Sequence, residues 1–254
     1  MSFETSEADG GVDEQAVAER ARRLDGASPQ EILREAMASH GDGLRVAFSG
    51  AEDVILVDMA CEIGGEVRVF VVDTGRLFEE TLEFIDRIRA HYGVAIEVAF
   101  PQTEAVEGLV RTKGLYSFRQ DGHAQCCAIR KVEPLRRVLS GATGWVTGQR
   151  RDQSPDTRAT VPVVQVDGQH RDARGVPLLK YNPLAAWSSD QVWRYLRGAG
   201  IPFNPLHARG FVSIGCAPCT RPILPGQHER EGRWWWEDVG KRECGLHLGP
   251  PAET

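Results

Sequence analysis

The sequence predicts an α/β fold built on a mostly parallel, twisted sheet with helices on both faces. In the first half of the chain, short apolar runs alternate with segments of helical periodicity, which is the order of βαβ units. The runs over residues 44–48, 67–72 and 94–100 lack the alternation of a half-exposed strand, so we expect them to be covered on both faces. At 254 residues the chain can bury one substantial core.

Each element of the first half has a local signal. Residues 28–31 read Ser-Pro-Gln-Glu, which predicts a helix start with a serine N-cap, a proline in the first turn and a capping box; this helix should end near Gly41. Further helices are expected over residues 52–63, 77–91 and 104–110. Polar turns follow Phe48 and Val72, at the carboxyl ends of two strands, and open α/β sheets bind ligands at that edge.

The second half is less regular. The expected elements are a helix over residues 126–139, a strand over 145–147, antiparallel strands over 161–166 and 178–181, and a helix over 188–196. The two antiparallel strands are expected to meet at an Asp167-Gly168 turn. From residue 201 onward prolines and glycines dominate, so this segment should wrap the surface.

These patterns divide the chain into three expected parts. Residues 1–27 lack strong periodicity and should be mobile or loosely helical. Residues 28–239 should form the α/β domain. Residues 240–254 should form a mobile C-terminal tail.

Composition restricts the classes of function. The net charge of −6 argues against a nucleic-acid binder held by bulk electrostatics, although a local basic site for a small anion stays open. No apolar run reaches the length of a membrane span, and the acidic N-terminus does not read as a secretory signal. We therefore expect a cytoplasmic protein without membrane contact. Clustered cysteines in that compartment suggest a metal site or catalysis rather than structural disulfides.

The cysteines carry the strongest chemical signal. Four of them form two pairs, Cys126-Cys127 and Cys216-x-x-Cys219, which together make a ligand set for one metal centre. Adjacent cysteines converge poorly on a single zinc ion, whereas each can bind a different iron of a cluster, so the pattern favours a four-iron cluster. Zinc, or plain burial of the thiols, remains the alternative. Cys244 is left free to react, and nearby basic residues favour its thiolate.

The turn that begins at Ser49 is a weaker signal. A serine-glycine turn between a strand and a helix exposes backbone N–H groups to an anion such as phosphate. The turn is no Walker A loop, because the glycine-lysine signature is missing. Taken alone, the signal is weak and a plain tight turn is the better explanation.

Several motifs in order resemble those of the bacterial assimilatory adenylyl-sulfate (APS) reductases, within the wider phosphoadenylyl-sulfate (PAPS) reductase family. The resemblance runs from about residue 44 to residue 247. The motifs occupy residues 49–54 (SGAEDV), 73–77 (DTGRL), 126–135 (CCAIRKVEPL), 148–154 (GQRRDQS), 216–222 (CAPCTRP), 232–237 (GRWWWE) and 243–247 (ECGLH).

The resemblance implies an adenine nucleotide α-hydrolase-like fold and the thioredoxin-dependent reduction of APS to sulfite and AMP. Cys244 would attack the substrate sulfur and become an S-sulfocysteine, which a thioredoxin then cleaves. One 4Fe-4S cluster would be held by Cys126, Cys127, Cys216 and Cys219. The implied substrate-binding residues are Ser49, Gly50, Asp53, Asp73, Thr74, Lys131, Gly148, Arg158, Arg230, Arg233 and His247. Whether the protein forms a homo-oligomer stays open.

The chain departs from the wider family's pattern at the first turn. Relatives that use ATP often read S-G-G-K-D-S there, whereas this chain has Ala51, Glu52 and Val54. The missing lysine argues against ATP chemistry, and so against a sulfur-transfer enzyme acting on tRNA. The four cluster cysteines favour APS as substrate, with PAPS or both nucleotides as the alternative. A zinc-stabilised binding module without catalysis is the remaining rival.

Other features have plain structural explanations. Cys61 is expected in the core, and His207 and His228 are expected to be core or surface residues rather than ligands. His123 lies just before the cluster cysteines, where a substrate contact is an alternative, but it is not counted among the site residues. The triplet Trp234-Trp235-Trp236 is expected to anchor the segment before the tail with one ring exposed, although a thioredoxin recognition patch is an alternative.

Overall fold

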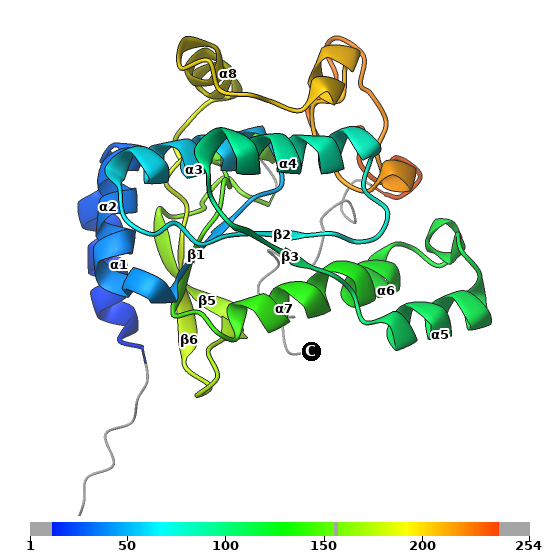
Figure 1. The fold of residues 1–254 in the computed structure, drawn as a ribbon, viewed down its shortest axis with the longest axis horizontal. Helices are drawn as coiled ribbons and strands as arrows, with labels where there is room; N and C mark the ends of the chain where they lie inside the picture. Colours follow the sequence, from blue (N-terminus) through cyan, green and yellow to red (C-terminus); the bar gives the residue numbers. More distant parts are fainter. Residues whose placement is uncertain (1–11, 155–156, 239–254) are drawn as a thin grey trace, which may run out of the picture.

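The computed structural model describes residues 12–154 and 157–238, which form a six-stranded sheet covered by helices (Figure 1). The strand order is β3-β2-β1-β4-β6-β5. The strands are β1 Leu44–Ala47, β2 Val69–Val72, β3 Ile96–Ala99, β4 Gly144–Val146, β5 Val164–Arg171 and β6 Pro177–Tyr181. All neighbouring strands run parallel except β5, which pairs antiparallel with β6 at one edge. The predicted mostly parallel sheet is therefore confirmed.

Helices pack on both faces of this sheet (Figure 1). The helices of the first half are α2 Pro29–His40, α3 Ala51–Ile63, α4 Glu79–Tyr92 and α5 Thr103–Lys113; later come α6 Ala124–Cys127, α7 Glu133–Leu139 and α8 Ser189–Gly198. One core layer joins α2, α3, α4 and α8 to the sheet, and a smaller layer packs Leu135 and Leu139 of α7 on the opposite face. Two separate layers explain why β1 and β2 read as continuous apolar runs. The expectation of cover on both faces is wrong for β3, because β3 is an edge strand whose Val98 side chain is 40% exposed.

The N-terminal segment contributes more than the sequence suggests. The expected capping box of α2 is present, with Ser28 and Glu31 bonding each other's backbone. Upstream of it, α1 spans Glu14–Leu24, begins at an Asp13 N-cap and packs along β5. Val17 and Leu24 of α1 are buried in the larger core layer. The domain therefore extends into residues 1–27, where we expected only a mobile or loosely helical segment.

Two elements of the second half differ from expectation. The β5–β6 hairpin turns at residues 172–176 rather than at Asp167-Gly168. Asp167 instead lies within β5 with its carboxylate buried, where it accepts bonds from the Trp145 indole (2.7 Å) and a His170 ring nitrogen (2.9 Å). Burial of a paired carboxylate thus overrides the local turn signal.

The helix expected over residues 126–139 is interrupted. A π-helical turn, Ala128–Val132, joins α6 to α7. Pro134 follows in the first turn of α7, and because proline has no N–H it cannot bond the carbonyl four residues earlier. π-turns within helices are frequent at functional sites, and this one carries Lys131.

The segment from residue 201 runs across the sheet's carboxyl edge as turns and short 3₁₀ helices, Pro205–Arg209 and Ala217–Cys219. An isolated bridge between Thr220 and Arg233 closes its last loop. The expectation that this segment wraps the surface is confirmed. In the part of the chain that the structure describes, no helix combines the length and apolar character needed to cross a membrane.

Candidate active site

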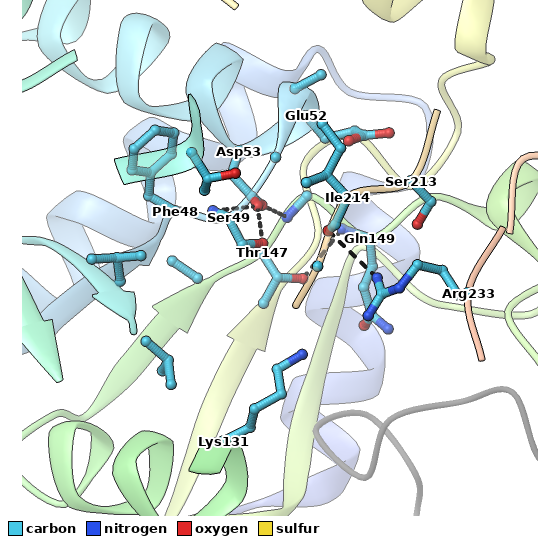
Figure 2. A pocket seen from close by; sticks show the side chains of 18 of the residues that line it. Phe48, Ser49, Glu52, Asp53, Lys131, Thr147, Gln149, Ser213, Ile214 and Arg233 are labelled. Atoms are coloured by element: carbon cyan, nitrogen blue, oxygen red, sulfur yellow. Dashed lines mark hydrogen bonds between the residues drawn. The ribbon is translucent and has the colours of Figure 1, made fainter. Parts of the chain in front are cut away.

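A cleft opens at the carboxyl edge of the sheet, where β1 lies between β2 and β4 (Figure 2). The chain runs outward from β1 to β2 and β3 on one side and to β4 and β6 on the other, so this is the topological switch point at which open α/β sheets bind ligands. The turns after β1, β2 and β4 form its floor. Residues 212–216 and 229–234 of the C-terminal segment form the facing wall.

The cleft brings together most of the side chains that the resemblance implied. Those that line it are Ser49, Gly50, Asp53, Thr74, Lys131, Gly148, Arg158, Arg230 and Arg233. In Figure 2 the Lys131 amine and the Arg233 guanidinium approach the cleft from two distant segments. Asp73 is not among the lining residues; its carboxylate accepts a bond from the Gly75 N–H (2.8 Å) and shapes the turn after β2. Cys244 and His247 lie outside the described residues.

Asp53 joins the two turns that form the cleft floor. One carboxylate oxygen accepts bonds from the Ser49 N–H (2.9 Å) and hydroxyl (2.7 Å), and the other accepts a bond from the Gly148 N–H (2.8 Å) (Figure 2). Burial raises the pKa of Asp53 to about 6, against the opposing effect of these hydrogen bonds. Asp53 therefore holds the β1 and β4 turns in register, which is a positioning role.

The raised pKa of Asp53 predicts a pH dependence of stability. Since the folded-state pKa of about 6 lies above the usual 3.8, the folded protein holds this proton more tightly than the unfolded chain. This contribution is complete below the unfolded pKa and is lost as pH rises through 6, by up to about 3 kcal/mol. We expect the free energy of unfolding in urea of the wild type, relative to that of the Asp53→Asn variant, to decrease between pH 4 and pH 7. A pH-independent difference would contradict the raised pKa.

Gly148 allows the β4 turn to approach α3 closely. A Cβ atom at this position would lie 2.6 Å from the Asp53 Oδ1 atom and 2.6 Å from the Glu52 Cβ atom. We expect Gly148→Ala to lower the free energy of unfolding by about 1–3 kcal/mol, measured in urea, because the turns must separate. Gly108→Ala in α5 is the matched control, since a Cβ there meets nothing within 4 Å and should stabilise by about 0.5–1 kcal/mol. Equal effects of the two changes would contradict the close approach.

A buried ion network beside the cleft was missed by the sequence analysis. The Arg150 side chain is 1% exposed, and its Nη2 atom lies 2.9 Å from Glu52 Oε1 and 3.1 Å from Glu229 Oε2. The Gln153 amide also donates to Glu52 (3.1 Å). The network ties the start of α3 to the C-terminal segment directly before Arg230. The one sequence feature that pointed to this ion network is Glu52, which occupies a position where related proteins often have lysine.

The two cysteine pairs meet in a second cavity. Cys126, Cys127, Cys216 and Cys219 form a cluster with Phe118, Trp234 and Trp236 and line the same cavity. Burial raises the pKa of Cys126, and burial together with the neighbouring Cys216 raises the pKa of Cys219 to about 12. Four thiols gathered in an enclosure of aromatic and basic side chains are a donor set for a metal centre that needs thiolates. No three His, Cys, Asp or Glu side chains within residues 12–154 and 157–238 are spaced to hold a single metal ion.

The cysteine cavity adjoins the cleft. Lys131, Cys216, Arg233 and Trp234 line both. The Thr74 hydroxyl lies 3.1 Å from the Cys216 Sγ atom, which links the turn after β2 to the cysteine quartet. A ligand in the cleft therefore has a thiol of the quartet in its wall.

Arg130 and His123 complete the enclosure and were not assigned site roles from the sequence. Arg130 is buried, donates to the Thr74 carbonyl (2.7 Å) and lowers the pKa of Cys126 against the effect of burial. His123 stacks on Trp234 with a centroid distance of 4.3 Å and bonds the Glu237 carboxylate (2.7 Å). His123 therefore lies in the wall of the cysteine cavity and is not among the residues that line the cleft.

Comparisons with known proteins agree with this geometry. Residues 43–222 match the model of the phosphoadenosine phosphosulfate reductase domain. The chain is 56% identical over 222 residues to an adenosine 5'-phosphosulfate reductase of Pseudomonas aeruginosa (strain LESB58), covering 87% of this chain and 83% of that protein. It is 53% identical to the 5'-adenylylsulfate reductase 1, chloroplastic, of Arabidopsis thaliana, covering 93% of this chain and about half, 51%, of that protein.

Solved structures agree on the fold. A phosphoadenylyl-sulfate (PAPS) reductase from Candida auris in complex with phosphate superposes with a TM-score of 0.69 at 25% identity, covering 83% of this chain and 98% of that one. An FMN adenylyltransferase from Candida glabrata superposes with a TM-score of 0.55 at 14% identity, covering 94% and 77%, which shows the shared fold alone. The adenine nucleotide α-hydrolase-like fold expected from the motifs is confirmed. The chain belongs to the phosphoadenosine phosphosulfate reductase family of oxidoreductases.

Proposed function

We propose that the protein reduces adenylyl sulfate to sulfite and AMP in sulfate assimilation, with thioredoxin as the source of electrons. The observation that carries the proposal is the wall shared by the cleft and the cysteine cavity, formed by Lys131, Cys216, Arg233 and Trp234. The names of the similar bacterial and plant reductases, which refer to the same nucleotide, support it. The reaction would take place in the cytoplasm, where thiols stay reduced.

In the proposed reaction the cations of the cleft hold the substrate's phosphate and sulfate oxygens. Lys131, Arg158, Arg230 and Arg233 line the cleft from three different segments. Arginine suits forked contacts to such oxyanions, and lysine acts as a point charge. Asp53 and Arg150 keep the surrounding turns in place.

The Cys244 thiolate attacks the sulfate sulfur. A sulfur–sulfur bond forms, the bond from that sulfur to the bridging oxygen breaks, and AMP leaves with the electron pair on its phosphate oxygen. A thioredoxin thiolate then attacks the Cys244 sulfur, sulfite leaves with the electron pair of the sulfur–sulfur bond, and the second thioredoxin thiol resolves the mixed disulfide. The dithiol is oxidised to a disulfide while the substrate sulfur gains two electrons.

The four clustered cysteines would hold one 4Fe-4S cluster. When bound, the cluster would supply a fixed charge beside the anion site. It would transfer no electrons, because the thioredoxin dithiol supplies both. Iron and acid-labile sulfide measured on anaerobically purified protein should each approach four per chain. One zinc without sulfide would favour the rival binding module.

Steady-state kinetics test the reaction. We expect sulfite and AMP from APS and thioredoxin, with kcat/KM for APS well above that for PAPS. A preference for PAPS, or equal values for the two nucleotides, would favour the alternative of a PAPS or dual reductase. No product from either nucleotide with an intact cluster would overturn the proposal.

A further inference from the structure

A surface of arginines stacked on aromatic rings lies outside the cysteine cavity. We call Leu115, Tyr116, Arg119, Arg221 and Trp235 the arginine–aromatic surface. The Arg119 guanidinium lies 5.7 Å from the Tyr116 ring centre and 5.5 Å from the Trp235 ring centre, and the Arg221 guanidinium also lies 5.5 Å from the Trp235 ring centre. Leu115 and Tyr116 are each 57% exposed. Stacking orders the arginine side chains, so little further entropy is lost when a partner binds them.

This surface is built on the segments that carry the cysteines. Arg119 donates to the carbonyl of Pro218, which lies between Cys216 and Cys219 (3.4 Å). Trp236, next to Trp235, packs on Phe118 of the cysteine cavity with a centroid distance of 5.7 Å. Trp235 precedes Cys244 by nine residues. A segment of that length can span up to about 30 Å, which is long enough for Cys244 to meet a protein bound at this surface.

The charge of the surface indicates what binds it. The chain as a whole carries −6, which disfavours an acidic partner at long range. The ion pairs found within residues 12–154 and 157–238 do not include Arg119 or Arg221. A partner with carboxylates around an apolar centre would match both the arginines and the exposed rings, and Tyr, Trp and Arg are the residues that most often dominate binding energy.

We propose that the arginine–aromatic surface docks the protein dithiol reductant through carboxylates on that protein. The inference rests on the proposed function, because only a reductant that must reach Cys244 needs this location. It also supplies the role that the tryptophan triplet left open: Trp234 is buried against the cysteine cavity, whereas the partly exposed Trp235 belongs to the docking surface.

The test measures turnover of the holoenzyme at saturating APS while the concentration of a bacterial thioredoxin is varied. Arg221→Glu and Arg119→Glu should each raise the KM for thioredoxin about tenfold. The wild-type kcat/KM for thioredoxin should fall with salt more steeply than that of either variant. Within residues 12–154 and 157–238, the Arg221 side chain makes no hydrogen bond to the segments that carry the cysteines, so Arg221→Glu keeps the test valid if Arg119→Glu disturbs the cavity.

Arg197→Glu is the matched control. Arg197 is an exposed arginine of α8 that stacks on Trp193 at 5.6 Å, and its replacement should leave the KM for thioredoxin unchanged. Sulfonation of Cys244 by APS without any reductant, followed by mass spectrometry, should be unchanged in all three variants. Absence of sulfonation in the wild type would count against the proposed function itself, independently of docking.

Three results would overturn the docking proposal. The first is an unchanged thioredoxin KM in both arginine variants. The second is slower sulfonation of Cys244 in these variants, which would mean that the chain's own C-terminal residues occupy the surface. The third is a change of oligomeric mass in sedimentation, which would mean that a second copy of the chain does.

Discussion

Replacement of Cys244 by serine is expected to abolish transfer of the sulfonate to the protein and to lower turnover by at least about a thousandfold. A serine hydroxyl stays protonated near neutral pH, whereas a cysteine thiol ionises far more readily, and Lys241, Arg242 and His247, close to Cys244 in the sequence, favour its thiolate. Mass spectrometry of the anaerobic protein after mixing with APS should show a gain of one sulfonate on the wild type alone, confined to the peptide that holds Cys244.

Cys61→Ser is the matched control for this experiment. Cys61 lies on α3, packs against the larger core layer, and burial raises its pKa, so it is a poor nucleophile. The Cys61→Ser protein should gain the sulfonate at the wild-type rate. A Cys244→Ser protein that still gains the sulfonate would refute Cys244 as the attacking group.

Replacement of Arg150 by methionine is expected to lower the free energy of unfolding by about 3–5 kcal/mol, because Glu52 and Glu229 would then share a buried site without their cation. Burial already raises the pKa of Glu229 with Arg150 present. Since Glu229 directly precedes Arg230, we also expect the KM for APS to rise more than kcat falls. Urea unfolding and steady-state kinetics of the same variant measure both effects.

Arg151→Met provides the comparison at the neighbouring position. Arg151 pairs with the exposed Asp25, and exposed pairs contribute at most about 1 kcal/mol. A double-mutant cycle of Arg150→Met with Glu229→Gln should show that the second change recovers part of the lost stability, because it removes an unpaired charge. Additive losses would show that the two side chains do not interact.

The chemistry-bearing residues could be predicted because their signals are local. The cysteine pairs need only their own spacing to read as ligands, and the turn that begins at Ser49 needs only to follow a buried strand. Parallel strands place their carboxyl ends along one edge, so turns distant in sequence were expected together. The cleft contains them, together with Lys131.

The role of Asp53 could not be predicted in the same way. The resemblance implied a substrate contact, whereas the structure places both carboxylate oxygens in bonds to backbone and hydroxyl groups of Ser49 and Gly148. Arg150 was missed for a related reason, since its partners lie 98 and 79 residues away in the sequence. A pairing between residues so far apart produces no periodic pattern in the sequence, because it depends on how the segments pack.

By itself, the sequence determined the order of most strands and helices, the two closely spaced cysteine pairs that the structure brings together, and the family. These depend on short-range preferences and on residue identity. Only the tertiary structure decided which carboxylates pair with a buried arginine or accept hydrogen bonds from the backbone. It also decided that the N-terminal helix joins the core and that the cysteine cavity and the cleft share a wall. Each of these outcomes is settled by desolvation, which a residue experiences only once the segments around it have packed.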